Sequence, residues 1–93
     1  MLDVIELRRA VRRTGTDFDD DLLSLAESAR VIMQAAGIAR QEDDAMYDAA
    51  VRNYVKGNFD TSAPEAEACR GIFDDLKRTM RLSSKYREVD GNA

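Results

Sequence analysis

Residue spacing between Phe18 and Ala36 limits the possible folds of this chain more than any other feature. Apolar side chains recur there every three or four residues, at positions 18, 22, 25, 29, 32 and 36. This spacing places them on one face of an α-helix, whereas a half-buried strand would alternate apolar and polar residues. Gly37 follows directly, and glycine is common just beyond the last turn of a helix. The segment therefore predicts a long amphipathic helix that ends at Gly37.

Three further segments show helical spacing, at about residues 3–13, 43–58 and 63–82, and no segment shows sustained strand alternation. The chain has 93 residues, the length of one domain. We therefore predict an all-α fold, a compact bundle of about four helices whose short connections favour antiparallel neighbours. We assign residues 1–83 to the helical domain. Residues 84–93 carry no apolar stripe and are predicted to form a flexible C-terminal tail.

Polar residues mark where the last two predicted helices begin. Asp43 and Asp44 are both good N-caps for the third helix. The sequence SAPE begins the fourth helix. Ser62 can accept a hydrogen bond from the backbone N–H of Glu65 while the Glu65 side chain reaches back to Ser62, which is a capping box. Pro64 then lies in the first turn, where it forfeits no helical hydrogen bond.

Glycines and an aromatic residue shape the other predicted boundaries. Gly15 ends the first helix, and Gly57 loosens the end of the third. Phe59 is expected to pack under the corner that leads to the fourth helix. The residues predicted to lie in the core are Phe18, Leu22, Leu25, Ile32, Tyr54, Phe59, Ile72, Phe73 and Leu76.

The residue composition does not favour an enzyme. Cys69 is the only cysteine, and the chain has no histidine. An intramolecular disulfide, a Cys–His nucleophile pair and a zinc site of the usual Cys/His type are therefore excluded. The sequence also lacks a glycine-rich phosphate loop and a Ser/His/Asp set. We expect a protein that is not an enzyme and that needs no cofactor or metal.

The acidic sequence DFDDD, at residues 17–21, could suggest a divalent cation site. Calcium loops need ligands spread along a loop with a turn glycine and a distal glutamate, and no glutamate falls at that distance here. Carboxylates in the first turn of a helix meet the positive end of the helix dipole. Stabilisation of the helix start is therefore the favoured role of Asp19, Asp20 and Asp21.

Charge and hydropathy limit the possible partners. The net charge of −4 argues against general binding to nucleic acid. The N-terminal sequence MLDVIELRRAVRR has charges among its apolar residues, unlike a signal peptide. No apolar run approaches the ~20 residues that a membrane span requires. We expect no membrane partner, and a protein that is cytosolic where it is made.

The sequence LRRAVRR holds the one basic cluster, formed by Arg8, Arg9, Arg12 and Arg13. Three explanations are open: a solvated or ion-paired helix face, a contact with a neighbouring subunit, and a contact with DNA phosphates. A helix-turn-helix is disfavoured, because the helix after the turn glycine begins with carboxylates that would face phosphates. A small helical DNA-binding regulator and a helical adaptor or inhibitor of one protein remain alternatives.

The sequence NYVKGNFDTSAPEAEACRGIFDDLKRTMRLSSKYRE resembles the C-terminal half of small head–tail connector proteins of tailed bacteriophages, a family of adaptor, head-completion and DNA-packaging proteins. The likeness extends over roughly residues 1–88. Gly57, Asp60 and Ala63 depart from the pattern, where alanine, glycine and asparagine are commoner. The matching residues are Tyr54, Lys56, Asn58, Phe59, Pro64, Glu65, Ala66, Glu67, Leu76, Leu82 and Ser83.

This resemblance implies a structural role in virion assembly. Such connectors form a homo-oligomeric ring of about a dozen copies beneath the portal protein, in which head-to-tail contacts are closed by rotation. The ring extends the DNA channel and docks stopper or tail-completion proteins. Double-stranded DNA passes through without sequence-specific binding, which suits an acidic chain. The expected location is the head–tail interface of the virion, and the host cytoplasm during assembly, where the free chain could be a monomer.

Two groups of residues are predicted to make the contacts of such a ring. The first contacts a neighbouring subunit or the portal, and consists of Arg8, Arg9, Arg12 and Arg13 with the acidic residues Asp19, Asp20 and Asp21. The second is a portal-binding tail that becomes ordered on contact with its partner, because it cannot bury enough apolar surface alone. Its residues are Ser84, Lys85, Tyr86 and Arg87.

Overall fold

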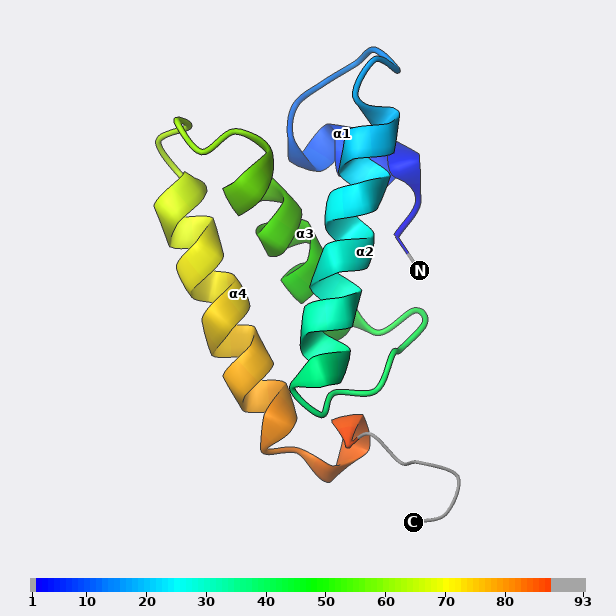
Figure 1. Ribbon diagram of the computed structural model, residues 1–93, viewed down its shortest axis with the longest axis vertical. Helices are drawn as coiled ribbons and strands as arrows, with labels where there is room; N and C mark the ends of the chain where they lie inside the picture. Colours follow the sequence, from blue (N-terminus) through cyan, green and yellow to red (C-terminus); the bar gives the residue numbers. More distant parts are fainter. Residues whose placement is uncertain (1, 88–93) are drawn as a thin grey trace.

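A computed structural model describes residues 2–87 and confirms the predicted all-α bundle (Figure 1). Within that range the chain forms α1 (Val4–Ala10), α2 (Asp19–Ala35), α3 (Ala45–Phe59) and α4 (Ala66–Arg81), followed by a short 3₁₀ helix, η1 (Ser84–Tyr86). The described range contains no strand, and its β-type pairing is an isolated antiparallel bridge between Ile38 and Arg87.

Helix α3 is the central element of the bundle. It packs against α4 on one side and α2 on the other, and the short helix α1 lies across the ends of α2 and α3 (Figure 1). The connection from α1 to α2 and the connection from α3 to α4 lie at the same end of the molecule (Figure 1). The connection from α2 to α3 and the 3₁₀ helix η1 lie at the opposite end.

The core is formed where α3 meets its neighbours. Fully buried side chains come from every α-helix, and the largest are Tyr47, Leu7, Leu22, Met33, Ile38, Met80, Val51 and Val55. Of the predicted core residues, Leu22 and Phe73 are buried. Five others pack against the core while remaining partly exposed: Leu25, Ile32, Tyr54, Phe59 and Leu76.

The prediction was wrong for two core residues. Phe18 is 40% exposed and Ile72 is 45% exposed. Successive residues of an α-helix lie about 100° apart around its axis. Phe73 faces the core, so the preceding Ile72 is rotated away from it and its side chain points outward. Phe18 precedes the first turn of α2, and its ring packs at the end of the bundle against the ring of Phe59.

Gly37 ends α2 as predicted. Its backbone has φ +90°, a conformation that glycine adopts without the strain a side chain would cause. The N–H of Gly37 donates to Gln34 O at 3.0 Å, and the N–H of Ile38 donates to Met33 O at 2.9 Å. Ile38 and Met33 are both fully buried. These bonds and this apolar contact form a Schellman motif.

The same motif ends α1 earlier than the sequence predicted. Arg12 has φ 60° and donates its N–H to Arg9 O at 3.1 Å, while the N–H of Arg13 donates to Arg8 O at 2.9 Å. Helix α1 therefore stops at Ala10, and the chain turns at an arginine where glycine is usual.

Asp44 caps α3, whereas Asp60 forms a turn in the connection before α4. Asp44 is the N-cap of α3 and accepts from the backbone N–H of Tyr47 at 2.9 Å, which settles the choice between the two predicted caps. The predicted capping box at Ser62 is wrong. Asp60 accepts from both the hydroxyl and the N–H of Ser62, at 2.6 and 3.1 Å. This turn occupies Ser62, and α4 begins at Ala66 without a side-chain cap.

Gly57 has a different role from the predicted loosening of α3. The helix continues past it to Phe59, and Gly57 is buried against α4. A Cβ atom there would lie 2.6 Å from Arg70 Cγ, 3.0 Å from Arg70 N and 3.1 Å from Ala66 O. Arg70 Nη1 also donates to Gly57 O at 2.7 Å. The missing side chain therefore permits the close approach of α3 and α4.

The predicted flexible tail was placed too early in the chain. Ser84–Tyr86 forms η1, Tyr86 is buried, and its carbonyl accepts from the N–H of Ala39 at 2.8 Å. These residues are part of the folded domain, because the chain turns back after α4 and covers the connection from α2 to α3. The remainder of the predicted tail, residues 88–93, lies outside the described residues.

Substitution Gly57→Ala should lower the free energy of unfolding by about 1–3 kcal/mol, because the new methyl group overpacks the contact with α4. The loss should occur although alanine is about 1 kcal/mol more favourable than glycine within a helix. Gly71→Ala in α4 is the matched control, since a Cβ there meets nothing within 4 Å. It should stabilise the fold. Urea denaturation measures both variants, and stabilisation by Gly57→Ala would contradict the proposed packing.

Candidate functional site

The structure pairs two of the predicted contact residues with each other. Arg8 in α1 donates from Nε to Asp19 Oδ1 at 2.7 Å and from Nη2 to Asp19 Oδ2 at 2.5 Å. This two-point hydrogen bond from Arg8 lowers the pKa of Asp19, and the bond to Asp19 raises the pKa of Arg8. The pair joins α1 to the start of α2, so both residues are engaged within the chain.

The other arginines and aspartates of the first predicted contact group remain at the surface. Arg9, Arg12, Asp20 and Asp21 are exposed, and none of them forms an ion pair within residues 2–87. Arg9 lies on α1, whereas Arg12 lies in the turn that follows it. The basic cluster is therefore divided into one structural arginine and three that face solvent or a surface hollow.

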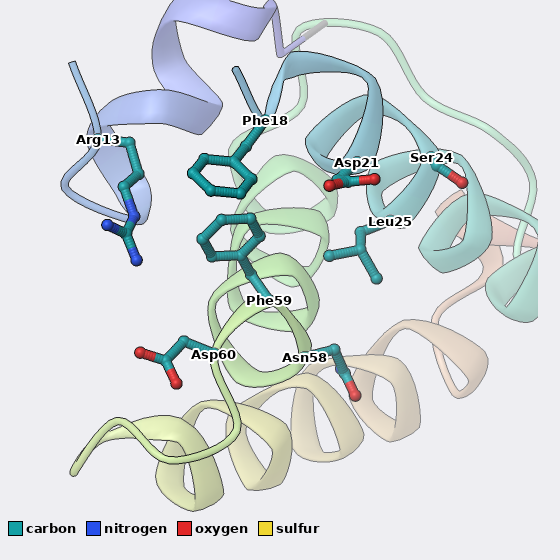
Figure 2. A pocket seen from close by; sticks show the side chains of 8 residues that line it. All are labelled: Arg13, Phe18, Asp21, Ser24, Leu25, Asn58, Phe59 and Asp60. Atoms are coloured by element: carbon teal, nitrogen blue, oxygen red, sulfur yellow. The ribbon is translucent and has the colours of Figure 1, made fainter. Parts of the chain in front are cut away.

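Arg13 lies against two aromatic rings at one end of the bundle (Figure 2). Its guanidinium carbon lies 5.5 Å from the centre of the Phe18 ring and 5.6 Å from the centre of the Phe59 ring. The two rings meet edge to face, with their centres 5.3 Å apart. Such cation–π and aromatic contacts hold the connection from α1 to α2 against the end of α3.

A hollow of about 610 Å³ opens beside these rings. Figure 2 shows the side chains that line it, drawn from the connection after α1, the first turns of α2 and the end of α3. The lining combines apolar and charged groups: Arg13, Phe18, Asp21, Ser24, Leu25, Asn58, Phe59 and Asp60. An aromatic floor with charges at the rim suits the recognition of a protein side chain.

Asp60 is held in place at this rim by its own turn. The hydroxyl of Ser62 is the main cause of its lowered pKa, and the backbone N–H of Ser62 and the charge of Arg13 act in the same direction. The carboxylate therefore stays ionised and keeps a fixed orientation between α3 and α4.

A second polar cluster closes the opposite end of the bundle. Asp44 accepts from Tyr86 Oη at 2.8 Å, from Lys85 Nζ at 2.7 Å and from the N–H of Tyr47. Burial of Asp44 by itself would raise the pKa, but the bonds from Lys85, Tyr47 and Tyr86 together outweigh it and lower the pKa to about 2. Lys85 and Tyr86, which the sequence placed in a portal-binding tail, are thus bound within the chain.

The other predicted tail residues lie at the surface beside this cluster. Ser84 and Arg87 are exposed, and the backbone of Arg87 pairs with that of Ile38. A partner that bound residues 84–87 would meet Ser84, Lys85 and Arg87 from outside, with Tyr86 held in the fold.

The described part of the chain shows neither a metal cluster nor a membrane span. Within residues 2–87 no group of three His, Cys, Asp or Glu side chains could hold a metal ion. No described helix is long and apolar enough to cross a membrane. Cys69 is buried.

Comparisons of the chain with protein-family models, with curated proteins and with solved structures gave no match. The resemblance to phage head–tail connectors therefore rests on the sequence motif alone. What the chain does is a matter for proposal, argued from that motif and from the surfaces described above.

Sequence reasoning missed two parts of these sites. The bond between Asp44 and Tyr86 joins residues 42 positions apart, and no local pattern announces such a pair. The turn at Asp60 had a visible signal, since an aspartate two residues before a serine is typical of a turn in which the carboxylate binds the following backbone. The predicted capping box assigned Ser62 to Glu65, whereas in the structure Ser62 binds Asp60.

Asp44→Asn should destabilise the protein by about 1–2 kcal/mol near neutral pH, because a buried cap loses its charge-assisted bonds. The folded pKa of about 2 lies below the usual 3.8. The stability contributed by the carboxylate is therefore complete above about pH 4 and is lost as the pH falls towards about 2. The difference in unfolding free energy between the wild type and Asp44→Asn should therefore become smaller as the pH falls over that range.

Urea unfolding at about pH 5 and about pH 2.5 tests this linkage. Asp75→Asn is the control, because Asp75 pairs with Arg78 on the exposed face of α4 and a surface pair contributes little. The control should leave stability unchanged at both values of pH. An equal loss for Asp44→Asn at both values would show that the carboxylate charge does not stabilise the fold.

Proposed function

We propose that this protein is a head–tail connector of a tailed bacteriophage, a structural assembly protein rather than an enzyme. The observation that carries the proposal is the sequence run from Tyr54 to Ser83, which resembles that family. Its residues build one structural unit, the hairpin of α3 and α4. Tyr54 packs edge to face on Phe73 with ring centres 5.0 Å apart, Phe59 packs on Phe18, and Pro64 precedes the first turn of α4.

In this proposal the chain acts by making contacts, with no bond-making chemistry. Copies assemble head to tail into a ring beneath the portal protein, and the ring docks a stopper or tail-completion protein while DNA passes through it. Arg9 of one copy contacts the exposed carboxylates of Asp20 and Asp21 on the next. The net charge of −4 supports a channel wall that DNA does not adhere to.

Molar mass measured by light scattering after size exclusion, over a wide range of protein concentration, is the primary test. A closed oligomer with nothing larger above it supports the connector. A chain that remains monomeric both alone and in the presence of portal protein would contradict it. A monomer that shifts duplex DNA at physiological salt would favour the alternative, a small helical DNA-binding regulator.

Charge reversal tests the subunit contact within the ring. Arg9→Glu should raise the protein concentration needed for assembly at least about tenfold, because the new carboxylate faces the carboxylates of the neighbouring copy. The double variant Arg9→Glu with Asp20→Arg should restore assembly, since every copy carries both changes. Thermal stability should stay unchanged, because both side chains are exposed.

Arg81→Glu is the matched control, since Arg81 is an exposed arginine at the far end of α4. It should assemble like the wild type. If Arg9→Glu assembles normally as well, the proposed contact between Arg9 and the acidic residues is wrong, whatever the oligomeric state.

A further inference from the structure

We propose that a groove between the end of α1 and the α3–α4 connection docks an acidic segment of another protein, in which carboxylates stand next to apolar side chains. The hollow has a volume of about 350 Å³. Residues 10–13 form one wall, and Asp60, Pro64 and neighbouring residues form the other. We call it the basic groove because Arg12, Arg13 and Lys56 all line it.

Among the described residues, the three cations of the basic groove bind no carboxylate directly, although the charge of Arg13 acts on Asp60. Within residues 2–87, neither Arg12, Arg13 nor Lys56 forms an ion pair. Arg13 instead lies over the rings of Phe18 and Phe59. Arg8 on α1, by contrast, is bound to Asp19. The groove therefore offers three cationic groups that form no ion pair within residues 2–87, and they outnumber its two carboxylates, Asp60 and Glu65.

The remaining lining decides what kind of ligand fits. Val11, Phe59 and Pro64 supply apolar surface between the cations, so the groove suits a segment that alternates carboxylate and apolar side chains. Asp60 and Glu65 also line the groove, so its lining combines three cations with two carboxylates. The phosphates of a nucleic acid recur at every nucleotide and would meet these two carboxylates, whereas a peptide can place its carboxylates at the cations and apolar side chains elsewhere. Charge complementarity thus favours an acidic protein segment over DNA or RNA.

This inference goes beyond the proposed connector. The groove would bind an acidic segment whether or not the chain forms a ring, and it uses Arg12 and Arg13 while the proposed subunit contact uses Arg9. Failure of either proposal can therefore be recognised without the other.

A short synthetic peptide that alternates glutamate and leucine is the probe, with the same peptide carrying glutamine as its control. Binding to the full chain is followed by amide chemical shifts and by fluorescence anisotropy. The glutamate peptide should shift the resonances of residues 10–13, Lys56 and Phe59. Its affinity should fall at about 0.5 M salt, where charges are strongly screened. The glutamine peptide should bind at least about tenfold more weakly.

Two variants of Arg12, with Arg9→Glu as their control, separate binding from stability. Arg12→Glu should weaken the affinity for the peptide at least about tenfold, and Arg9→Glu, which lies outside the groove, should not. Arg12→Gly should weaken binding as well, yet leave the unfolding midpoint unchanged or raised, because glycine suits the φ of 60° at that position. A loss of binding with retained stability cannot come from misfolding.

Several results would overturn the proposal. Absence of shifts in the groove, equal binding of the glutamate and glutamine peptides, or unchanged binding by both Arg12 variants would each show that the groove does not select acidic segments. A duplex oligonucleotide that displaces the peptide at physiological salt would assign the groove to nucleic acid. Self-association that Arg12→Glu abolishes, with no peptide binding, would assign it to a second copy of the chain.

Discussion

The close contact between α3 and α4 at Gly57 is the constraint on which the rest of the structure depends. Gly57 is buried, and its carbonyl accepts from Arg70 in the facing helix. A side chain at this point would meet the backbone of α4, so the two helices could not lie as close. Their spacing sets the path of the connection that follows, and therefore the positions of Phe59 and Asp60.

The position of Phe59 in turn organises one end of the bundle. Its ring meets Phe18, and Arg13 lies against both rings, so the connection from α1 to α2 is held to the end of α3. Both surface hollows described above open around this contact, because each is lined by Arg13, Phe59 and Asp60. The surface proposed to bind partners therefore lies next to the close contact between α3 and α4.

The opposite end of the bundle is organised by charge instead of aromatic packing. Asp44 caps α3 and also binds Lys85 and Tyr86, so one carboxylate joins the start of α3 to the chain after α4. All its bonds come from donors within the fold, and the group is buried. This cluster therefore stabilises the fold, whereas the exposed arginines at the other end form no ion pair among the described residues, which is why we propose partner contacts there.

The sequence by itself determined the helices and several of their boundaries. The all-α class and the long helix that ends at Gly37 could be predicted, and the cap of α3 could be narrowed to Asp43 or Asp44. These features depend on interactions between residues at most five positions apart. Tertiary structure alone decided how the four arginines differ. Arg8 binds Asp19 and Arg13 lies over two aromatic rings, whereas Arg9 and Arg12 form no ion pair within residues 2–87, although all four look alike along the chain.

The same reason explains the other differences between expectation and structure. The role of Gly57 depends on a helix that begins nine residues later, and the place of Tyr86 depends on an aspartate 42 residues before it. Periodicity shows which face of a helix is apolar, but it does not show how closely two helices approach or which charges meet when they do. The distance between two helices and the pairing of their charges depend on how side chains from distant parts of the chain fit together in the packed bundle.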